Sequence, residues 1–319
     1  MPRTERRSVK LTPERFNRLN DRYVKYVFAD PKNKALLIAL INDVLADVPE
    51  GAEKIPPIVD LSYRDREAAP AYKGDKVPRF DIVAVTADGQ IFHIEFQVAK
   101  DPHTLPRVLH YGARNVFMRT REGEEYSSVR AIVIMVANFT LFEDAEDYHT
   151  VHRILDVKTL AWHMKGLEFH FIELTKLRAR GGEPQTGLER LMYWFGDIGG
   201  EEMMETLVKE DARILRMAQL EDLFRTDPDL LEDYFDQERA RMDYEAAMDY
   251  SRKEGRAEGE KRGEKRGIKL GRAEGEKRGI KLGREEALLD TARRMKAMKM
   301  SDEQIAQATC LSLAEVEAL

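Results

Sequence analysis

The sequence predicts an α/β protein whose core is a mixed sheet flanked by helices. Short apolar segments with alternating side chains occur at residues 80–86 and 91–98, and a glycine-containing turn separates them. A helical pattern at 104–121 follows, and then a segment at 129–136, apolar except for Arg130, that is typical of a buried strand. A strand, a helix and a strand in this order predict a parallel pair joined by a crossover helix, beside an antiparallel hairpin.

The segments before and after this unit complete the expected core. Thr12-Pro13 predicts the start of a first helix, and Asp30-Pro31 predicts its end and the cap of a second helix that runs through Leu36, Leu40 and Leu45. Residues 58–63 favour a strand, 64–75 a polar loop, and 168–174 a last strand. The predicted core therefore spans residues 1–182.

Composition narrows the class of protein. The chain has 319 residues, 43% of them hydrophobic, and its formal charge is −6. Cys310 is the single cysteine, which excludes an internal disulfide or a cysteine-based zinc site. No apolar segment has the length of a membrane span and the N-terminus lacks the apolar core of a signal peptide, so we expect a cytoplasmic protein without a membrane partner.

Three polar residues in the predicted hairpin form the main candidate site. Asp81 opens the first strand, and Glu95 and Gln97 lie two apart on the second, on the same face as His93. A two-residue turn would pair Asp81 with Phe96. A three-residue turn, Ala87-Asp88-Gly89 with Gly89 at positive φ, would place Asp81 opposite Glu95, and this is the turn we predict.

Two neighbouring carboxylates are stabilised by a divalent cation, and Mg²⁺ (or Mn²⁺) suits oxygen ligands of this kind. Such an ion polarises a phosphoryl group and acidifies water. The uncharged Gln97 can position a water molecule or a phosphate oxygen. The alternative interpretation is a row of solvated polar side chains on an open sheet face.

The helix at 104–121 contributes a second set of polar residues. Its expected polar face carries Arg107, Tyr111 and Arg114, and its expected sheet-facing residues are Leu109, Gly112 and Val116. The helix begins just after Gln97, so Arg107 is a candidate to contact a phosphate of the nucleic-acid backbone. The alternative is a surface Arg–Tyr stack with neighbouring acids.

These residues belong to a series of motifs that resembles a known family. The motifs occupy residues 20–28, 76–81, 94–97, 107–111, 123–126 and 172–177. Together they resemble the Rpn family of recombination-promoting nucleases and putative transposases, within the PD-(D/E)XK nuclease superfamily, over about residues 15–240.

The resemblance implies a restriction-endonuclease-like core, with Asp81 and Glu95 as metal ligands. It places Gln97 where the superfamily has lysine, and it makes Asp21 a possible acid on the first helix. Lys76 and Arg79, with the three polar residues of the 104–121 helix, are the candidates for contacts with DNA.

The rest of the chain is predicted to be helical. Residues 183–250 favour an acidic helical extension, and 251–286 carry a glycine at every fourth position in a twelve-residue repeat. Two interpretations stay open for this repeat: a dimerising helix, or a flexible basic linker that holds nucleic acid. Residues 287–319 resemble a helix-turn-helix, but the final helix lacks Lys and Arg, which favours a packing or dimer module.

We therefore expect a Mg²⁺-dependent DNA endonuclease that is linked to recombination or mobile elements and acts as a homodimer without a small-molecule cofactor. One alternative is a non-catalytic DNA-binding or scaffold protein that keeps the nuclease fold. Another is a helical oligomerisation adaptor.

Overall fold

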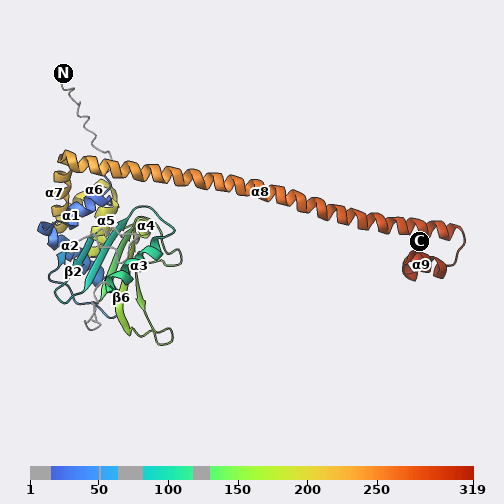
Figure 1. Cartoon of the computed structure of the whole chain (residues 1–319), viewed down its shortest axis with the longest axis horizontal. Helices are drawn as coiled ribbons and strands as arrows, with labels where there is room; N and C mark the ends of the chain where they lie inside the picture. The colour runs from blue at the N-terminus through green and yellow to red at the C-terminus, as the bar shows by residue number, and fades with distance from the viewer. Residues whose placement is uncertain (1–15, 50–51, 64–81, 118–129) are drawn as a thin grey trace, which may run out of the picture. The chain divides into compact units, whose positions relative to one another are not determined.

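The structure is a computed structural model, which describes residues 16–49, 52–63, 82–117 and 130–319. Its contacts divide the chain into two units, Met1–Asp243 and Tyr244–Leu319. The first unit contains a six-stranded mixed sheet flanked by helices (Figure 1). The predicted fold class is confirmed.

The strand order in the sheet is β1-β2-β3-β4-β6-β5. The pairs β3–β4 and β4–β6 are parallel, and the other pairs are antiparallel. Strand β4 is buried along its whole length, as its apolar sequence predicts. The strands are β1 (Ser62–Tyr63), β2 (Ile82–Val85), β3 (Ile91–Gln97), β4 (Ala131–Ala137), β5 (His149–Ile154) and β6 (Met164–Glu173).

The β2–β3 hairpin has the predicted three-residue turn. Val85 pairs with Ile91, and the Thr86 N–H donates to the Gln90 carbonyl at 3.0 Å. Gly89 has φ +89°, a conformation that glycine adopts without a steric penalty. At the other end of the described hairpin, Ile82 pairs with Ile94, the residue before Glu95.

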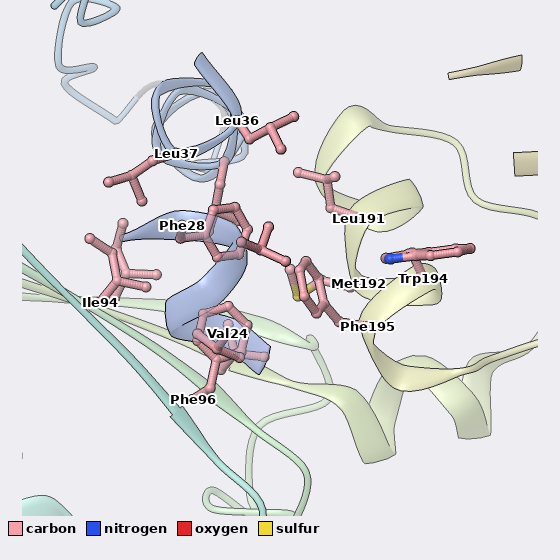
Figure 2. Packing of buried hydrophobic residues seen from close by; sticks show 14 of the residues in the cluster. Val24, Phe28, Leu36, Leu37, Ile94, Phe96, Leu191, Met192, Trp194 and Phe195 are labelled. Carbon is pink, nitrogen blue, oxygen red and sulfur yellow. The ribbon is translucent and has the colours of Figure 1, made fainter. Parts of the chain in front are cut away.

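One face of the sheet carries the main hydrophobic core. Figure 2 shows Phe28 and Phe195 beside Phe96 of β3, and their ring centroids lie 5.3–6.0 Å apart. Rings at this separation add favourable aromatic contacts to the burial of apolar area. The helices that contribute to this core are α1 (Asp21–Phe28), α2 (Lys34–Ala46), α4 (Leu174–Arg180), α5 (Gly187–Gly196), α6 (Gly200–Glu210), α7 (Ala212–Thr226) and, through Tyr234, the start of α8 (Pro228–Ala297).

The crossover helix α3 (Thr104–Phe117) contacts β4 and β6 from the opposite face. Gly112 permits this approach, because a Cβ there would lie 3.0 Å from Phe169 and 3.1 Å from Leu167. The predicted orientation of Gly112 toward the sheet is correct. The prediction for Leu109 and Val116 is wrong: both are exposed, and Val108 is the buried apolar residue of the helix.

Two further predicted boundaries need correction, and one strand was not predicted. Helix α1 begins at Asp21, after the Asn20 cap, and residues 16–20 are not helical. The strand predicted at 58–63 is restricted to Ser62–Tyr63. Strand β5 was not predicted, because its polar sequence lacks the apolar alternation that marks a half-buried strand.

The Asp30-Pro31 signal is confirmed as the end of α1, but Asp30 caps the short 3₁₀ helix η1 (Pro31–Asn33), where its carboxylate accepts from the Lys32 N–H. Helix α2 follows directly, with Asn33 at its N-cap and no side-chain cap bond. Asp227 likewise accepts from the N–H groups of Asp229 and Leu230 at the start of α8.

Helix α8 (Pro228–Ala297) includes the whole glycine repeat, so the repeat is helical. No heavy atom outside the local backbone lies within 4 Å of where a Cβ would be added at any repeat glycine from Gly255 to Gly283, within the described part of the chain.

The C-terminal module is built from α9 (Asp302–Thr309) and α10 (Leu313–Glu317) packed against the end of α8. Its small core contains Ala292, Ile305 and Val316. Both helices begin at a serine cap: Ser301 and Ser312 each accept from the backbone N–H three residues later, in a complete capping box.

Candidate active site

The candidate site lies at the end of β3, on the face of the sheet that α3 covers. Glu95 and Gln97 share this face with His93, since side chains alternate along a strand and Phe96 points into the opposite core. The sequence predicts an open face here. The structure corrects this, because His93 is fully buried and the Glu95 side chain is only 12% exposed.

Arg107 joins the polar residues of the site. Its Nη2 donates to Glu95 Oε1 at 3.0 Å and to Gln97 Oε1 at 2.9 Å, while Nη1 donates to Asp101 Oδ2 at 3.3 Å. The prediction that the N-terminal half of this helix borders Glu95 and Gln97 is confirmed by these contacts. A planar guanidinium is suited to hold two acceptors in a fixed geometry.

Glu95 is held in an environment that suits a cation. Burial raises the pKa of the Glu95 carboxyl, and the nearby Arg107 guanidinium opposes this rise. Its Oε2 is buried and has no hydrogen-bond partner among the described residues. A buried carboxylate oxygen without a donor is costly, and a hard cation is one group that satisfies it.

Glu95 therefore fits as an oxygen donor to a divalent metal, whereas Gln97 Oε1 already accepts from Arg107. The described residues contain no cluster of three or more His, Cys, Asp or Glu side chains that could bind a metal by themselves. Asp81, the second predicted ligand, lies outside the described residues, as do Lys76 and Arg79.

Two residues of the site were missed by sequence reasoning. Thr104, the first residue of α3, accepts from Gln97 Nε2 at 3.2 Å, and the Ala99 carbonyl accepts from the same nitrogen at 3.0 Å. Asp101 binds Arg107. Asp101 and Thr104 lie in the short connection between β3 and the body of α3. Their closeness to Gln97 in the sequence was the signal that could have identified them as site residues.

The other polar residues of α3 follow Arg107 along the helix. Tyr111 packs on His93 with ring centroids 5.3 Å apart, and Arg114 is half-buried. Complete burial lowers the pKa of His93 to about 3, so this imidazole is neutral at physiological pH. A neutral histidine under an aromatic ring is a packing element of the site.

Asp21 occupies the first turn of α1 and forms an ion pair with Lys25. Phe28, at the other end of the same helix, packs on Phe96 from the sheet face opposite to Glu95. In the described part of the chain Asp21 forms no hydrogen bond or ion pair with Glu95 or Gln97, and its assignment as a site acid stays a prediction.

The histidines that the sequence places three apart belong to a strand. His149 and His152 lie on β5 and not on a helix, so their side chains point to opposite faces of the sheet. His152 packs on Phe142 and Phe171. His149 instead enters a buried polar chain on the face of the main core.

That buried chain connects four titratable residues. Asp47 Oδ2 lies 2.9 Å from His149 Nδ1, His149 Nε2 lies 3.0 Å from His170 Nδ1, and His170 Nε2 lies 2.9 Å from Glu168 Oε1. Tyr148 donates to Asp47, and Arg153 donates to Glu168 at 3.0 Å. We define these four residues, Asp47, His149, His170 and Glu168, as the buried histidine chain.

No helix in the described ranges has both the length and the apolar character needed to cross a bilayer. Among curated proteins and solved structures, the searches found no match. A family model described as PD-(D/E)XK nuclease family transposase matches residues 18–251, which is more than half of the 319 residues. The matched region includes the whole sheet, Glu95, Gln97 and Arg107. The chain belongs to the PD-(D/E)XK nuclease family transposases.

Proposed function

We propose that this protein is a Mg²⁺-dependent endodeoxyribonuclease that hydrolyses phosphodiester bonds during recombination or the movement of mobile elements. The observation that carries the proposal is the Glu95 carboxylate, which is buried beside Gln97 and Arg107 and has one oxygen without a hydrogen-bond donor among the described residues. The family match supports a nuclease chemistry for this polar cluster.

The residue roles follow from side-chain chemistry. Asp81 and Glu95 would hold the metal through carboxylate oxygens, and Gln97 would orient a water molecule or a phosphate oxygen through its amide. When bound, Mg²⁺ or Mn²⁺ would polarise the phosphoryl group and lower the pKa of a bound water. Asp21 remains a further candidate acid.

DNA would contact the first unit on the side that carries Glu95 and Gln97. The candidates for phosphate contacts are Lys76 and Arg79, which precede Asp81, together with Tyr111 and Arg114 of α3. Contacts of this kind position the duplex and do not read its sequence. Arg107 contacts the acidic side chains of the site itself, and its role is treated below.

Plasmid nicking with Mg²⁺ or Mn²⁺ tests the proposal. Wild type is expected to nick DNA, and Glu95→Gln and Asp81→Asn are expected to lower the rate by more than about 100-fold. Asp144→Asn, a change at an exposed acid of the first unit, is the matched control and should leave nicking unchanged. Equal nicking by wild type and Glu95→Gln would exclude this site.

One observation favours the alternative of a non-catalytic DNA-binding protein. Arg107 already neutralises Glu95, and Gln97 brings no charge of its own. Retention of DNA by wild type in a mobility-shift assay, with no nicking under any divalent metal, would establish this second function. Loss of retention in Arg114→Gln would place the DNA on the α3 side.

The proposal includes a cytoplasmic homodimer formed through α8 or the C-terminal module. Within the repeat, Ile268, Leu270, Ile280 and Leu282 are all exposed, and exposed apolar side chains on a long helix favour association with a second helix. Light scattering after size exclusion should give twice the mass of the chain, and truncation after residue 250 should give a monomer. If the tail alone sets the assembly size and no DNA is bound, the oligomerisation adaptor gains support.

A further inference from the structure

We infer that Arg107 is a positioning residue, which holds Glu95 and Gln97 in the orientation that a divalent cation requires. This inference rests on the proposed function, because it assigns a role toward the metal that Glu95 would bind. It differs from a phosphate contact, the role that the sequence predicts for Arg107.

The hydrogen-bond count of the guanidinium supports this role. Nη2 carries two hydrogens, and its two acceptors are Glu95 Oε1 and Gln97 Oε1. Nη1 donates to Asp101. Both hydrogens of Nη2 are therefore used by the site's own side chains, and an incoming phosphate could reach this nitrogen only by displacing one of them.

The contact with Arg107 also leaves the second carboxylate oxygen of Glu95 available to a cation. Arg107 engages Oε1 of Glu95, whereas Oε2 is buried without a donor among the described residues. A carboxylate that is fixed through one oxygen presents the other in a defined direction. The ligands of metal sites are commonly oriented by an outer hydrogen bond of this kind.

The backbone around Arg107 fixes the position of the guanidinium. Its own N–H donates to the His103 carbonyl at 2.9 Å, and the next residue, Val108, is buried against the sheet. One turn farther, Gly112 brings α3 close to β6. The arginine side chain is 30% exposed, so it is anchored by its neighbours and is not a solvated surface group.

Three roles for Arg107 predict different metal affinities. A positioning residue predicts weaker metal binding when it is removed, because Glu95 loses its orientation. A competing cation that blocks the site predicts tighter binding. A phosphate contact predicts unchanged metal binding and weaker DNA binding.

The experiment titrates the full chain with Mn²⁺ and measures bound metal by electron paramagnetic resonance. The relevant site is the Mn²⁺ site that is lost in Glu95→Gln. Arg107→Gln is expected to weaken this site about tenfold, and Arg107→Lys to recover part of the loss, since an ammonium keeps the charge but not the planar fork. Arg225→Gln, at an arginine of similar exposure that pairs with Glu221 on α7, is the matched control and should bind Mn²⁺ as wild type does. Unchanged or tighter binding in Arg107→Gln would overturn the inference.

A metal-free measurement separates this inference from the proposed function. In EDTA, the Arg107→Gln substitution should lower the melting temperature when it is made in wild type. Made in the Glu95→Gln variant, it should lower the melting temperature much less, because the Glu95 carboxylate is already absent. If wild type has no Glu95-dependent Mn²⁺ site, the proposed function fails. This double-mutant cycle still decides whether Arg107 holds Glu95 in place. Equal shifts in both backgrounds would show that Arg107 does not hold Glu95.

Discussion

His149 Nε2 lies 3.0 Å from His170 Nδ1, and this contact is the centre of the buried histidine chain. Three short contacts link Asp47, His149, His170 and Glu168, and each contact between two lone-pair atoms needs one proton. Two neutral imidazoles supply only two. The chain is complete only when it holds one additional proton.

We predict that the two histidines of the chain together hold this additional proton at neutral pH. Although burial acts to raise them, hydrogen bonds from His149 and His170 lower the pKa values of Asp47 and Glu168, so both carboxylates are ionised. Burial lowers the pKa of His170, and charge on His149 lowers it further. Imidazole ¹⁵N shifts at pH 7 measure both ring nitrogens of each residue. Exposed His103 serves as the internal reference, and two neutral imidazoles at 149 and 170 would refute the assignment.

Glu168→Gln should destabilise the fold by about 3 kcal/mol, because it leaves Arg153 and the protonated pair without a buried counter-charge. Asp47→Asn should cost less, about 1 kcal/mol, since Asp47 is partly exposed and Tyr148 can still donate to the amide oxygen. Urea unfolding of the 1–243 region within the full chain, followed by tryptophan fluorescence, measures both. Equal losses would show that burial does not distinguish the two ends of the chain.

Stability should fall on acidification below about pH 6.5, in part because of His93. Burial lowers the pKa of His93 to about 3 in the folded state, whereas an unfolded histidine titrates near 6.5. The unfolded state therefore binds this proton first, and the stabilisation present above pH 6.5 is lost as the pH decreases. The loss from this residue at pH 5.5 is about 1.4 kcal/mol.

Urea midpoints at pH 7.5 and 5.5 check this value. His93→Gln should reduce the difference between the two pH values by about that amount, whatever its effect on stability at pH 7.5. An unchanged difference would mean that His93 is protonated in the fold. His163→Gln, a change at an exposed histidine, is the control.

The same substitution should have opposite effects at two helical glycines. Gly112→Ala places a Cβ 3.0 Å from Phe169 and should destabilise the first unit by about 1 kcal/mol, the cost of overpacking less the gain in helix propensity. Gly263→Ala meets open space and should stabilise α8 locally by about 1 kcal/mol. Hydrogen exchange read separately over α3 and α8 distinguishes the two. Stabilisation at both positions would contradict the close approach of α3 to β6.

The parts of the fold that sequence reasoning predicted are those with a local cause. The Ala87-Asp88-Gly89 turn sets the hairpin register through the conformation of one glycine, and the apolar β4 segment identifies a central strand. Strand β5 has neither signal, because His149 and Arg153 face buried partners that lie far away in the chain. Such partners become visible only when β5 and β6 are paired.

The candidate site divides in the same way. Alternation along β3 was sufficient to place Glu95 and Gln97 on one face. The orientation of α3 was not predictable from its apolar residues, because the helix turns Arg107 and Tyr111 toward the sheet and leaves Leu109 exposed. Helical periodicity favours a face formed by Leu109, Gly112 and Val116, of which Gly112 contacts the sheet and the other two are exposed. Arg107 instead donates to Glu95 and Gln97, and Tyr111 packs on His93.

The hairpin turn also limits how the first unit can change through insertion. Each residue of β2 faces either the α3 side of the sheet or the main core, depending on whether its offset from Gly89 is even or odd. One added residue that shifted β2 along its neighbour would exchange the environments of Val83 and Ala84 and present the wrong set of side chains to α3. We therefore expect viable lineages of this protein to vary the length of this connection rarely, and in steps that preserve parity.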